Sequence, residues 1–522
     1  MNILLLNPPP KDRSWYKAEH LGLAYLAAVM RQAGHHVFVF DALLENQNAE
    51  QTYQAISSRF NNIQLLGITA MEPEAITNSI KIIRQLRSDG MNFHVTAGGY
   101  LPTFWCDELL VKNQEIDSVV IGEGEETFRF LGETLEQKGD LTSIPGLVFR
   151  LPDGVIVHNR PRPLIRDLDQ LPFPTRDYLD VTYQKYHHAL VYSSRGCYHR
   201  CSFCQVAQFY RKSTGVPYRT RSAKNIADEI EMLVIEYGVR SIFFVDDEFI
   251  TESKHRHQVL KELIDEIKVR NLDINFMIQY RVDTGNNEPL LRSLKEVGLR
   301  AVFVGVESGV ESVLTRFSKG TTRAEIDSAL EIIQDLGFIS NCGYLFYTPS
   351  TTFEELEQSV EYMMTPGSPT LLKLIGMTVL KGTPEERTAR ELGILYETEF
   401  DLHYRIPDRR VASFAYLLHL YSPIYEPIIA DLYDALFMTG DLSPQLREKI
   451  FQEMKIAISQ IRCLNQKFLR NAIKEASNEV MEPPFWLEEL RSEFNGLNIF
   501  TQGLIGEGKA VLRSSGMKYN KY

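Results

Sequence analysis

Three cysteines lie close together near the middle of the chain, at C-x3-C-x2-C spacing. Cys197, Cys201 and Cys204 follow a short apolar run at residues 189–192, whose length and composition predict a strand. The chain has 6 cysteines in 522 residues, which indicates a reduced protein and argues against a disulfide framework. A loop that carries three thiols in this way predicts a metal site.

The number of thiols decides between two kinds of metal site. A structural zinc ion normally has four ligands, commonly in two close pairs. The other cysteines, at positions 106, 342 and 463, are far from the loop in sequence, so zinc is the second choice. Three thiolates suit three irons of a four-iron, four-sulfur (4Fe-4S) cluster, whose usual set is four cysteines. One iron then stays open for chemistry, as in an open catalytic metal site.

The cysteine spacing, with Phe203 immediately before the last cysteine, resembles that of the radical S-adenosylmethionine (SAM) enzymes. The resemblance implies that Cys197, Cys201 and Cys204 are the catalytic and metal-binding residues, and it adds Phe203 to the cofactor site. It also implies that the open iron binds the amino and carboxylate groups of SAM. The motif is short, so the rest of the chain has to support it.

Composition narrows the class of protein. The chain is 44% hydrophobic and 24% charged, which is ordinary for a globular protein, and its length favours two or three domains. A net charge of -12 argues against a nucleic-acid partner. No apolar run approaches the roughly 18 residues that span a bilayer, and the start has no basic segment typical of a signal peptide. We therefore expect a cytoplasmic protein without a membrane or nucleic-acid partner.

Residues 1–143 alternate short apolar segments with amphipathic ones. Strands are predicted near residues 3–6, 36–40, 64–69, 93–97 and 117–121, and helices near 21–34, 49–60, 73–89, 102–112 and 125–138. This alternation is typical of a Rossmann-like, doubly wound parallel sheet with helices on both faces. In such sheets, ligands bind beyond the carboxyl ends of the strands.

Residues suited to a ligand follow four of these predicted strands. Glycine lets a ligand approach the backbone and helix N-termini offer free N–H groups, although one glycine alone more often marks a turn or a cap. The predicted cofactor-binding residues of this region are Pro9, Met71, Glu72, Gly98, Gly99, Tyr100, Gly122, Glu123, Gly124 and Glu125. As a set they resemble the cobalamin-binding domain that precedes the radical SAM domain in one branch of that family.

One motif of cobalamin domains in general is missing from the chain. Asp41 is followed by residues 42–45, which contain no histidine, so the Asp-x-His-x-x-Gly motif that gives cobalt a histidine ligand is absent. Members of the radical SAM branch often lack this motif. The resemblance therefore implies a cobalt without a lower histidine, with the loop of Met71 and Glu72 nearest to that face.

Residues 144–185 separate two regions of alternating strands and helices. A hairpin is predicted over residues 144–158, and the proline-rich segment 160–180 is typical of a linker. Residues 186–395 then have predicted strands near 189–193, 240–246, 273–280, 300–306, 338–347 and 371–379. Six βα units are fewer than the eight of a closed barrel, so we expect a partial (β/α)6 barrel with its site at the carboxyl ends of the strands.

Polar residues at the ends of these strands would face the same space as the cysteine loop. Taken singly, such acidic residues equally well cap the next helix. The resemblance implies that Asp246 and Glu248 help to hold the SAM amino group, that Arg281 contacts the SAM carboxylate, and that Glu307 approaches the ribose or methionine part. Tyr347 replaces a glycine of the motif that usually contacts adenine. The resemblance therefore implies that its side chain stacks on a ligand or contacts the substrate instead. The predicted SAM-site residues are Asp246, Glu248, Gln279, Arg281, Glu307 and Tyr347.

Residues 396–522 are predicted to form a helical domain, which includes a long amphipathic run from Ser443 to about Ala476. Aromatic residues at helical spacing, as at 414–421, are more often core than cofactor contacts. We expect this domain to close the open side of the barrel, and the alternative is that it shapes the substrate pocket.

These motifs together predict a cobalamin-dependent radical SAM enzyme. The resemblance implies that the cluster cleaves SAM to a 5'-deoxyadenosyl radical, which activates an unactivated carbon of a small-molecule or peptide natural product to take a methyl group from methylcobalamin. A second SAM would remethylate the cobalamin, and an external donor such as flavodoxin or ferredoxin would supply electrons. The alternatives are ring contraction, cyclisation or dehydration without methyl transfer, and a non-enzymatic cobalamin sensor or assembly module. A methylthiolating enzyme is disfavoured because Cys106 is the only cysteine before residue 144.

Overall fold

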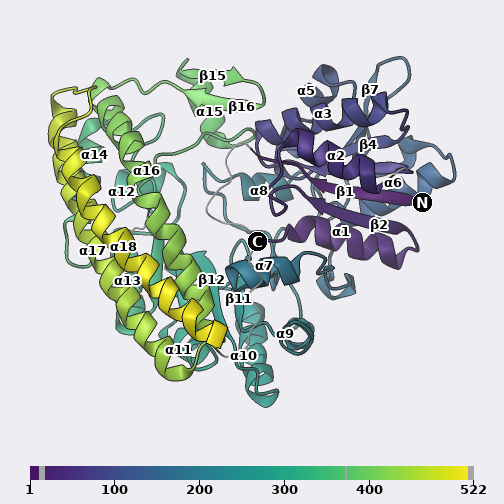
Figure 1. The fold of residues 1–522 in the computed structure, drawn as a ribbon. Coiled ribbons are helices and arrows are strands. Elements are labelled where there is room, and N and C mark those ends of the chain that lie inside the picture. Colours follow the sequence, from purple (N-terminus) through teal and green to yellow (C-terminus); the bar gives the residue numbers. More distant parts are fainter. Residues whose placement is uncertain (11–17, 61, 371–372, 515–522) are drawn as a thin grey trace.

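A computed structural model of the chain describes residues 1–10, 18–60, 62–370 and 373–514. Figure 1 shows an amino-terminal α/β unit in purple, a second α/β unit in teal, and long carboxy-terminal helices in green and yellow. In the part of the chain that the structure describes, no helix combines the length and the apolar character needed to cross a membrane.

The amino-terminal sheet has seven strands in the order β2-β1-β3-β4-β5-β6-β7, of which β1 to β5 pair in parallel. Side chains along β1 alternate between two cores, because Ile3 and Leu5 pack on the side of α1 and α6 whereas Leu4 and Leu6 pack on the side of α2, α3 and α5. This arrangement confirms the predicted doubly wound sheet. The elements are β1 (Asn2–Asn7), α1 (Leu21–Gln32), β2 (His36–Asp41), α2 (Ala49–Arg59), β3 (Leu65–Thr69), α3 (Pro73–Ser88), β4 (His94–Gly98), α4 (Tyr100–Phe104), α5 (Cys106–Lys112), β5 (Ser118–Val120), α6 (Glu125–Glu136), β6 (Leu147–Arg150) and β7 (Ile156–His158).

The predicted hairpin is present and belongs to this sheet. β6 pairs antiparallel with β7 and also with β5, so the hairpin extends the edge of the amino-terminal sheet. The single helix predicted over residues 102–112 is instead two helices, α4 and α5, because Trp105 leaves the helical conformation with φ -115° and ψ 23°.

The second unit is a five-stranded parallel sheet in the order β14-β13-β12-β11-β8, covered by helices on its outer face. This order is that of a partial barrel, which confirms the predicted fold class. A short two-stranded sheet, β9 with β10, lies beside it. The elements are α7 (Leu179–Tyr186), β8 (Ala189–Val191), β9 (Ser194–Arg195), α8 (Gln205–Tyr210), β10 (Arg219–Thr220), α9 (Ala223–Tyr237), β11 (Ser241–Phe244), α10 (Lys254–Val269), β12 (Asn275–Arg281), α11 (Glu288–Glu296), β13 (Leu299–Glu307), α12 (Glu311–Arg316), α13 (Arg323–Asp335), β14 (Ile339–Tyr344) and α14 (Phe353–Met363).

The sixth barrel strand, predicted over 371–379, is not formed as a regular strand in the described residues. Residues 371 and 372 lie outside them, and the rest makes a single parallel bridge between Leu345 and Ile375. The N–H of Phe346 donates to Ile375 O at 2.9 Å, and that of Met377 donates to Tyr347 O at 2.8 Å. The segment therefore borders the last strand with irregular pairing, and its Gly376 lies under the ring of Tyr347.

Three long helices, α16 (Arg409–Met438), α17 (Pro444–Ser477) and α18 (Trp486–Ser514), pack together beside the barrel, as Figure 1 shows. Asn341 of β14 donates a hydrogen bond to the hydroxyl of Tyr433 at 3.1 Å, and the ring of Phe243 lies 6.2 Å from that of Phe437. Phe243 and Asn341 lie on the same inner face of the strands as Gln279. Their contacts show that α16 covers the open, concave side of the barrel near the starts of the strands.

A hairpin that the sequence pattern did not predict precedes these helices. After α15 (Pro384–Glu391), β15 (Leu395–Thr398) pairs antiparallel with β16 (Asp401–Tyr404). Phe400 at its turn packs edge-on against Trp105, at 6.1 Å between ring centroids. This hairpin therefore joins the core of the amino-terminal unit.

Candidate functional site

The cysteine loop lies between β9 and α8, directly after the first barrel strand. Cys201 is buried, and Cys197 and Cys204 are half-buried. Gly196 turns the chain into the loop with a φ of 85°, and a Cβ there would lie 2.0 Å from the carbonyl oxygen of Pro217. Only glycine fits this turn, so Gly196, which no sequence motif singled out, sets the start of the loop.

Asp246 supports the chain just before the cysteine loop. Its carboxylate accepts hydrogen bonds from the N–H of Ser193 at 3.2 Å, from Ser193 Oγ at 2.7 Å and from Ser194 Oγ. Its neighbour Asp247 accepts a hydrogen bond from the N–H of Gly196 at 2.9 Å, and burial raises the pKa of Asp247 to about 6. Both carboxylates thus tie the end of β11 to the start of the loop.

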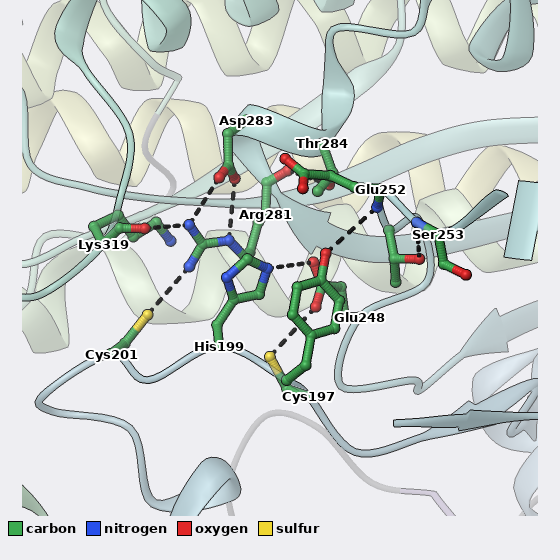
Figure 2. Close-up of polar contacts among 12 residues, drawn as sticks. Cys197, His199, Cys201, Glu248, Glu252, Ser253, Arg281, Asp283, Thr284 and Lys319 are labelled. Carbon is green, nitrogen blue, oxygen red and sulfur yellow. Dashed lines mark hydrogen bonds and ion pairs between the residues drawn. The ribbon is translucent and has the colours of Figure 1, made fainter. Parts of the chain in front are cut away.

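Glu248 faces the cysteines from the same strand end (Figure 2). Cys197 Sγ donates a hydrogen bond to Glu248 Oε2 at 3.3 Å, and His199 Nε2 lies 3.3 Å from Glu248 Oε1. Glu248 is fully buried, yet among the described residues its Oε1 and His199 Nε2 have no aligned hydrogen-bond partner. A buried carboxylate oxygen of this kind favours a cationic group, which fits the amino group of SAM.

Arg281 reaches the loop from the end of β12 (Figure 2). Its Nη1 donates to Cys201 Sγ at 3.2 Å, its Nη2 donates to Asp283 Oδ2 at 2.8 Å, and Nη2 also donates to the carbonyl oxygen of Lys319. On the same strand, Gln279 Nε2 donates to the carbonyl oxygen of Asp246 at 2.8 Å. A guanidinium beside a sulfur stabilises negative charge there, as a metal-bound thiolate requires.

Glu307 ends β13 in an unusual conformation. Its φ is 68°, a left-handed value that is costly for a residue with a Cβ, and its Oε1 lies 3.2 Å from Lys319 Nζ. A Cβ on Gly305 would lie 2.6 Å from Glu307 Oε1, so glycine there makes room for the carboxylate. Lys319 is 3% exposed and was not predicted, because it lies between two helices without a recognisable motif.

The two predicted aromatic residues of the SAM site pack against other parts of the barrel. Phe203 packs edge-on against Phe317, with 5.1 Å between ring centroids. Tyr347 is half-buried and covers Gly376, where an added Cβ would lie 2.1 Å from the ring. Its ring therefore lies flat on backbone.

The chemistry of the three thiols fits a metal cluster. Burial raises the pKa of the Cys197 thiol, and the Glu248 carboxylate raises it further. Burial also raises the pKa of the Cys204 thiol. Thiols in such surroundings stay protonated unless a bound metal stabilises the thiolates. The loop therefore matches the three-cysteine ligand set of a 4Fe-4S cluster with one open iron.

Most of the predicted cobalamin residues line the carboxyl edge of the amino-terminal sheet. The carbonyl oxygen of Pro9 accepts a hydrogen bond from Asn78 Nδ2 at 2.8 Å. Met71 is 66% exposed, and a large apolar side chain exposed beyond a strand end is suited to ligand contact. Gly99 has a φ of 100°, and a Cβ there would lie 3.2 Å from Thr69 Oγ1.

Helix N-termini and open backbone complete this edge. Glu72 is the N-cap of α3 and Gly124 is the N-cap of α6. A Cβ on Gly98 would meet only Val120, at 3.9 Å or more. Helix N-termini and accessible backbone at a strand edge suit a large polar ligand such as cobalamin.

His20, which the sequence did not single out, lies at the same edge. Its Nδ1 accepts the N–H of Leu23 at 3.1 Å, and its Nε2 lies 3.3 Å from Thr69 Oγ1. Burial lowers the pKa of His20 to about 4, so the imidazole is neutral near pH 7. It lies immediately before α1, and nothing in the sequence pattern places it beside Thr69, so only the fold brings it here.

The other predicted cobalamin residues lie toward the barrel. Tyr100 stacks on Phe209 of α8, with 4.3 Å between ring centroids, and a Cβ on Gly122 would lie 3.1 Å from a serine just after α8. Glu123 and Glu125 form ion pairs with arginines of the barrel. The structure therefore brings the end of the amino-terminal sheet into contact with the segment that follows the cysteine loop.

Comparisons with known proteins agree with this arrangement. Residues 191–363 match the model of the Radical SAM superfamily, and residues 14–131 match that of the B12 binding domain. An uncharacterized methyltransferase of Pyrococcus horikoshii is 30% identical over 369 residues, covering 69% of this chain and 77% of that protein. The anaerobic magnesium-protoporphyrin IX monomethyl ester cyclase of Rubrivivax gelatinosus is 28% identical over 349 residues, covering 65% of this chain and 60% of the cyclase.

Solved structures share the fold over most or all of the chain. The cobalamin-dependent SAM radical enzyme OxsB matches with a TM-score of 0.71 and 16% identity, covering 100% of this chain and 82% of its own. The radical SAM methyltransferase TsrM of Kitasatospora setae matches with a TM-score of 0.62 and 19% identity, covering 75% of both chains. The chain thus belongs to the cobalamin-dependent branch of the radical SAM enzymes, whose cofactors are a 4Fe-4S cluster, SAM and cobalamin.

Proposed function

We propose that this enzyme is a methyltransferase that moves a methyl group to an unactivated carbon of a small-molecule or peptide natural product. In this proposal residues 1–143 bind cobalamin, residues 144–185 add a hairpin to the amino-terminal sheet and connect the units, residues 186–395 bind the cluster and SAM, and residues 396–522 close the open side of the barrel. When bound, the cluster and SAM supply the radical that activates the substrate, and cobalamin supplies the methyl group.

The observation that carries the proposal is the contact between the two strand-end sites. Tyr100, at the end of β4, stacks on Phe209, which lies on the helix that follows Cys204. A methyl transfer between cobalt and a substrate radical needs both sites to open on one space. Contact between their borders supports that requirement.

The chain's own residues would hold SAM and the cluster. Cys197, Cys201 and Cys204 would bind three irons, Glu248 would accept a hydrogen bond from the SAM amino group, and Arg281 would stabilise the sulfur of Cys201. We further propose an external electron donor such as flavodoxin or ferredoxin, and a cytoplasmic setting that keeps the thiols reduced.

Deuterium-labelled SAM tests this function. The anaerobic protein with reconstituted cluster is incubated with reductant, its own cobalamin and SAM that carries a CD3 group, and the cobalamin is analysed by mass spectrometry. We expect a CD3 group on cobalamin and an equal amount of S-adenosylhomocysteine. Bound cobalamin that never takes up label while 5'-deoxyadenosine accumulates would contradict methyl transfer.

A second candidate function is oxidative cyclisation without methyl transfer. It is favoured by the similarity to the cyclase of Rubrivivax gelatinosus, at 28% identity over 65% of this chain. In that case substrate would increase 5'-deoxyadenosine formation, and the label of the SAM methyl group would stay out of the product.

A further inference from the structure

Four charged side chains form a buried cluster between the amino-terminal unit and the barrel. Arg195 Nη2 lies 2.7 Å from Glu125 Oε1, and its Nη1 lies 3.4 Å from Glu123 Oε1. Arg219 Nη1 donates to both oxygens of Glu123, at 2.9 and 2.8 Å. None of these four side chains is more than 11% exposed. We call them the interdomain ion cluster.

The pairing of β9 with β10 explains why the arginines need carboxylates from the other unit. Arg195 and Arg219 lie directly opposite one another in this two-stranded sheet. Like charges in such a position repel, and burial makes the repulsion stronger. Glu123 and Glu125 supply two compensating negative charges, so the amino-terminal unit stabilises the pairing of β9 with β10.

Further contacts make the geometry specific. The guanidinium of Arg195 lies over the ring of Tyr25, at 4.9 Å, and that of Arg219 lies over the ring of Tyr210, at 5.3 Å. Glu123 Oε2 also accepts the N–H of Ile165, at 3.0 Å, from the connecting segment. The cluster thus binds the amino-terminal unit, the connection and the barrel at one point.

This point is next to the cysteine loop. Arg195 is followed by Gly196 and Cys197, and Arg219 is two residues after Pro217, whose carbonyl oxygen packs on Gly196. Glu123 lies in the loop after β5 and Glu125 is the first residue of α6, both at the predicted cobalamin edge. A shift of the ion cluster would therefore move the two cofactor sites relative to each other.

We propose that Glu123, Glu125, Arg195 and Arg219 are positioning residues that set the distance between the cobalamin edge and the cysteine loop. This proposal rests on the proposed function for its effect on methyl transfer. The ion pairs themselves do not depend on that function. In this proposal the two carboxylates of the Gly-Glu-Gly-Glu segment bind arginines of the barrel and affect cobalamin only indirectly.

The test compares Glu125→Gln and Arg195→Lys with two matched controls in the full-length, reconstituted protein. Glu126→Gln removes a charge at the next position, where Glu126 pairs with Arg129 on the surface of α6, and Lys224→Gln changes an exposed residue of α9 that pairs with Asp228. In Glu125→Gln the neutral amide cannot replace the charge of the carboxylate, and in Arg195→Lys the lysine cannot replace both contacts of the guanidinium.

Two activities separate positioning from general damage. Formation of 5'-deoxyadenosine from SAM needs only the cluster loop, whereas transfer of the CD3 group from SAM to cobalamin needs both sites aligned. We expect the cluster variants to lose about 10- to 100-fold in cobalamin methylation, as for a displacement of about 1 Å, and to keep 5'-deoxyadenosine formation within about 2-fold of the controls. Equal loss of both activities, or loss of neither, would overturn the proposal.

A third readout does not depend on methyl transfer. Trypsin cleavage of the connecting segment at residues 160–180 should be faster in the cluster variants than in the controls, because the units separate more often. If wild-type protein methylates no cobalamin, the proposed function fails while this readout still decides the positioning role. If a single variant does not fold, the double variant Glu125→Gln with Arg195→Gln is tested in the same way, because it leaves no unpaired charge at that ion pair. Cleavage of this double variant at the rate of the controls would reject the positioning role.

Discussion

At the scale of single residues, the site consists of charges held in place by other charges. Glu248, Arg281 and Glu307 each contact a partner from another strand end or loop. Such preorganisation is what a radical reaction needs, because reactive atoms have to be positioned and shielded.

The charge of Glu248 should matter more than its size. Glu248→Gln keeps the size and shape of the side chain but removes the negative charge that faces the predicted SAM amino group. We expect SAM affinity to fall about 10- to 100-fold, as for the loss of a charge-assisted hydrogen bond, with unchanged iron content. Equilibrium binding of SAM to the reconstituted protein measures this. Glu252→Gln, at an exposed position nearby, is the control, and equal affinities for the two variants would contradict the assignment.

Each cysteine of the loop should be required for the cluster. Cys201→Ala removes a buried ligand beside Arg281, so we expect iron and sulfide contents and the visible absorbance of the reconstituted protein to fall to background. Cys463→Ala, at an exposed position on α17, should keep the full cluster. A Cys201→Ala protein with a normal iron content and SAM cleavage would exclude the three-cysteine ligand set.

At the scale of elements, glycine positions decide which loops can form. Gly196 and Gly238 both have left-handed φ values, 85° and 69°, but only Gly196 has a carbonyl oxygen where a Cβ would go. Gly238→Ala should cost about 1–2 kcal/mol in free energy of unfolding. Gly196→Ala should cost more and also lose the cluster, because the backbone at Pro217 has to move. Denaturant unfolding and iron content measure both effects, and equal costs would show that the close approach is unimportant.

The turn after β2 carries a pH-dependent element of stability. Burial raises the pKa of Asp41 from 3.8 to about 6, although its Oδ1 accepts the N–H of Leu44 at 3.0 Å. The folded state therefore holds this proton more tightly than the unfolded state. The contribution of the protonated Asp41 side chain to the free energy of unfolding is complete below pH 4. It is lost as the pH rises through about 6, and the total loss is at most about 3 kcal/mol.

Asp41→Asn removes this dependence and keeps the acceptor oxygen. We expect the stability difference between Asp41→Asn and wild type to increase in favour of the variant from pH 4 to pH 7. Urea unfolding at several pH values measures the difference, and a constant difference across this range would mean that the carboxyl group titrates normally.

The sequence predicted the elements whose residues show a clear period or motif. The strands before the cysteine loop and at β1 have strong apolar patterns, so they were placed correctly. The prediction of a sixth barrel strand was wrong, because the described part of this segment, from residue 373 onward, pairs irregularly around Gly376. Arg195 and Arg219 were not predicted as partners of the Gly-Glu-Gly-Glu loop, since pairs across units depend on how the units meet and leave no period in the sequence.

At the scale of the whole molecule, a second buried ion network joins the units. Arg176, in the connecting segment, binds Glu19 of the amino-terminal unit and Glu229 of α9, the latter at 2.7 Å. Arg221 also binds Glu229. Burial raises the pKa of Glu19 even though Arg176 opposes this effect. Tyr25 interacts electrostatically with Arg176 and Arg221 of this network and with Arg195, whose guanidinium lies over its ring, so the network is next to the interdomain ion cluster.

Removing the central cation of this network should destabilise the whole protein. Arg176→Met leaves Glu19 and Glu229 buried with less compensation, and we expect a loss of about 3–5 kcal/mol in free energy of unfolding. The matched control is Arg31→Met, because Arg31 forms a half-exposed ion pair, at 3.0 Å, with Asp177, the residue next to Arg176. We expect this substitution to lower the free energy of unfolding by about 0–1 kcal/mol. Adding Glu19→Gln to Arg176→Met should restore part of the loss, since one buried charge is then removed. Urea unfolding measures all three variants. If Arg176→Met is no less stable than Arg31→Met, the network does not hold the units together, and the geometry between the cofactor sites then depends on the other contacts between the units, which include the interdomain ion cluster and the stacking of Tyr100 on Phe209.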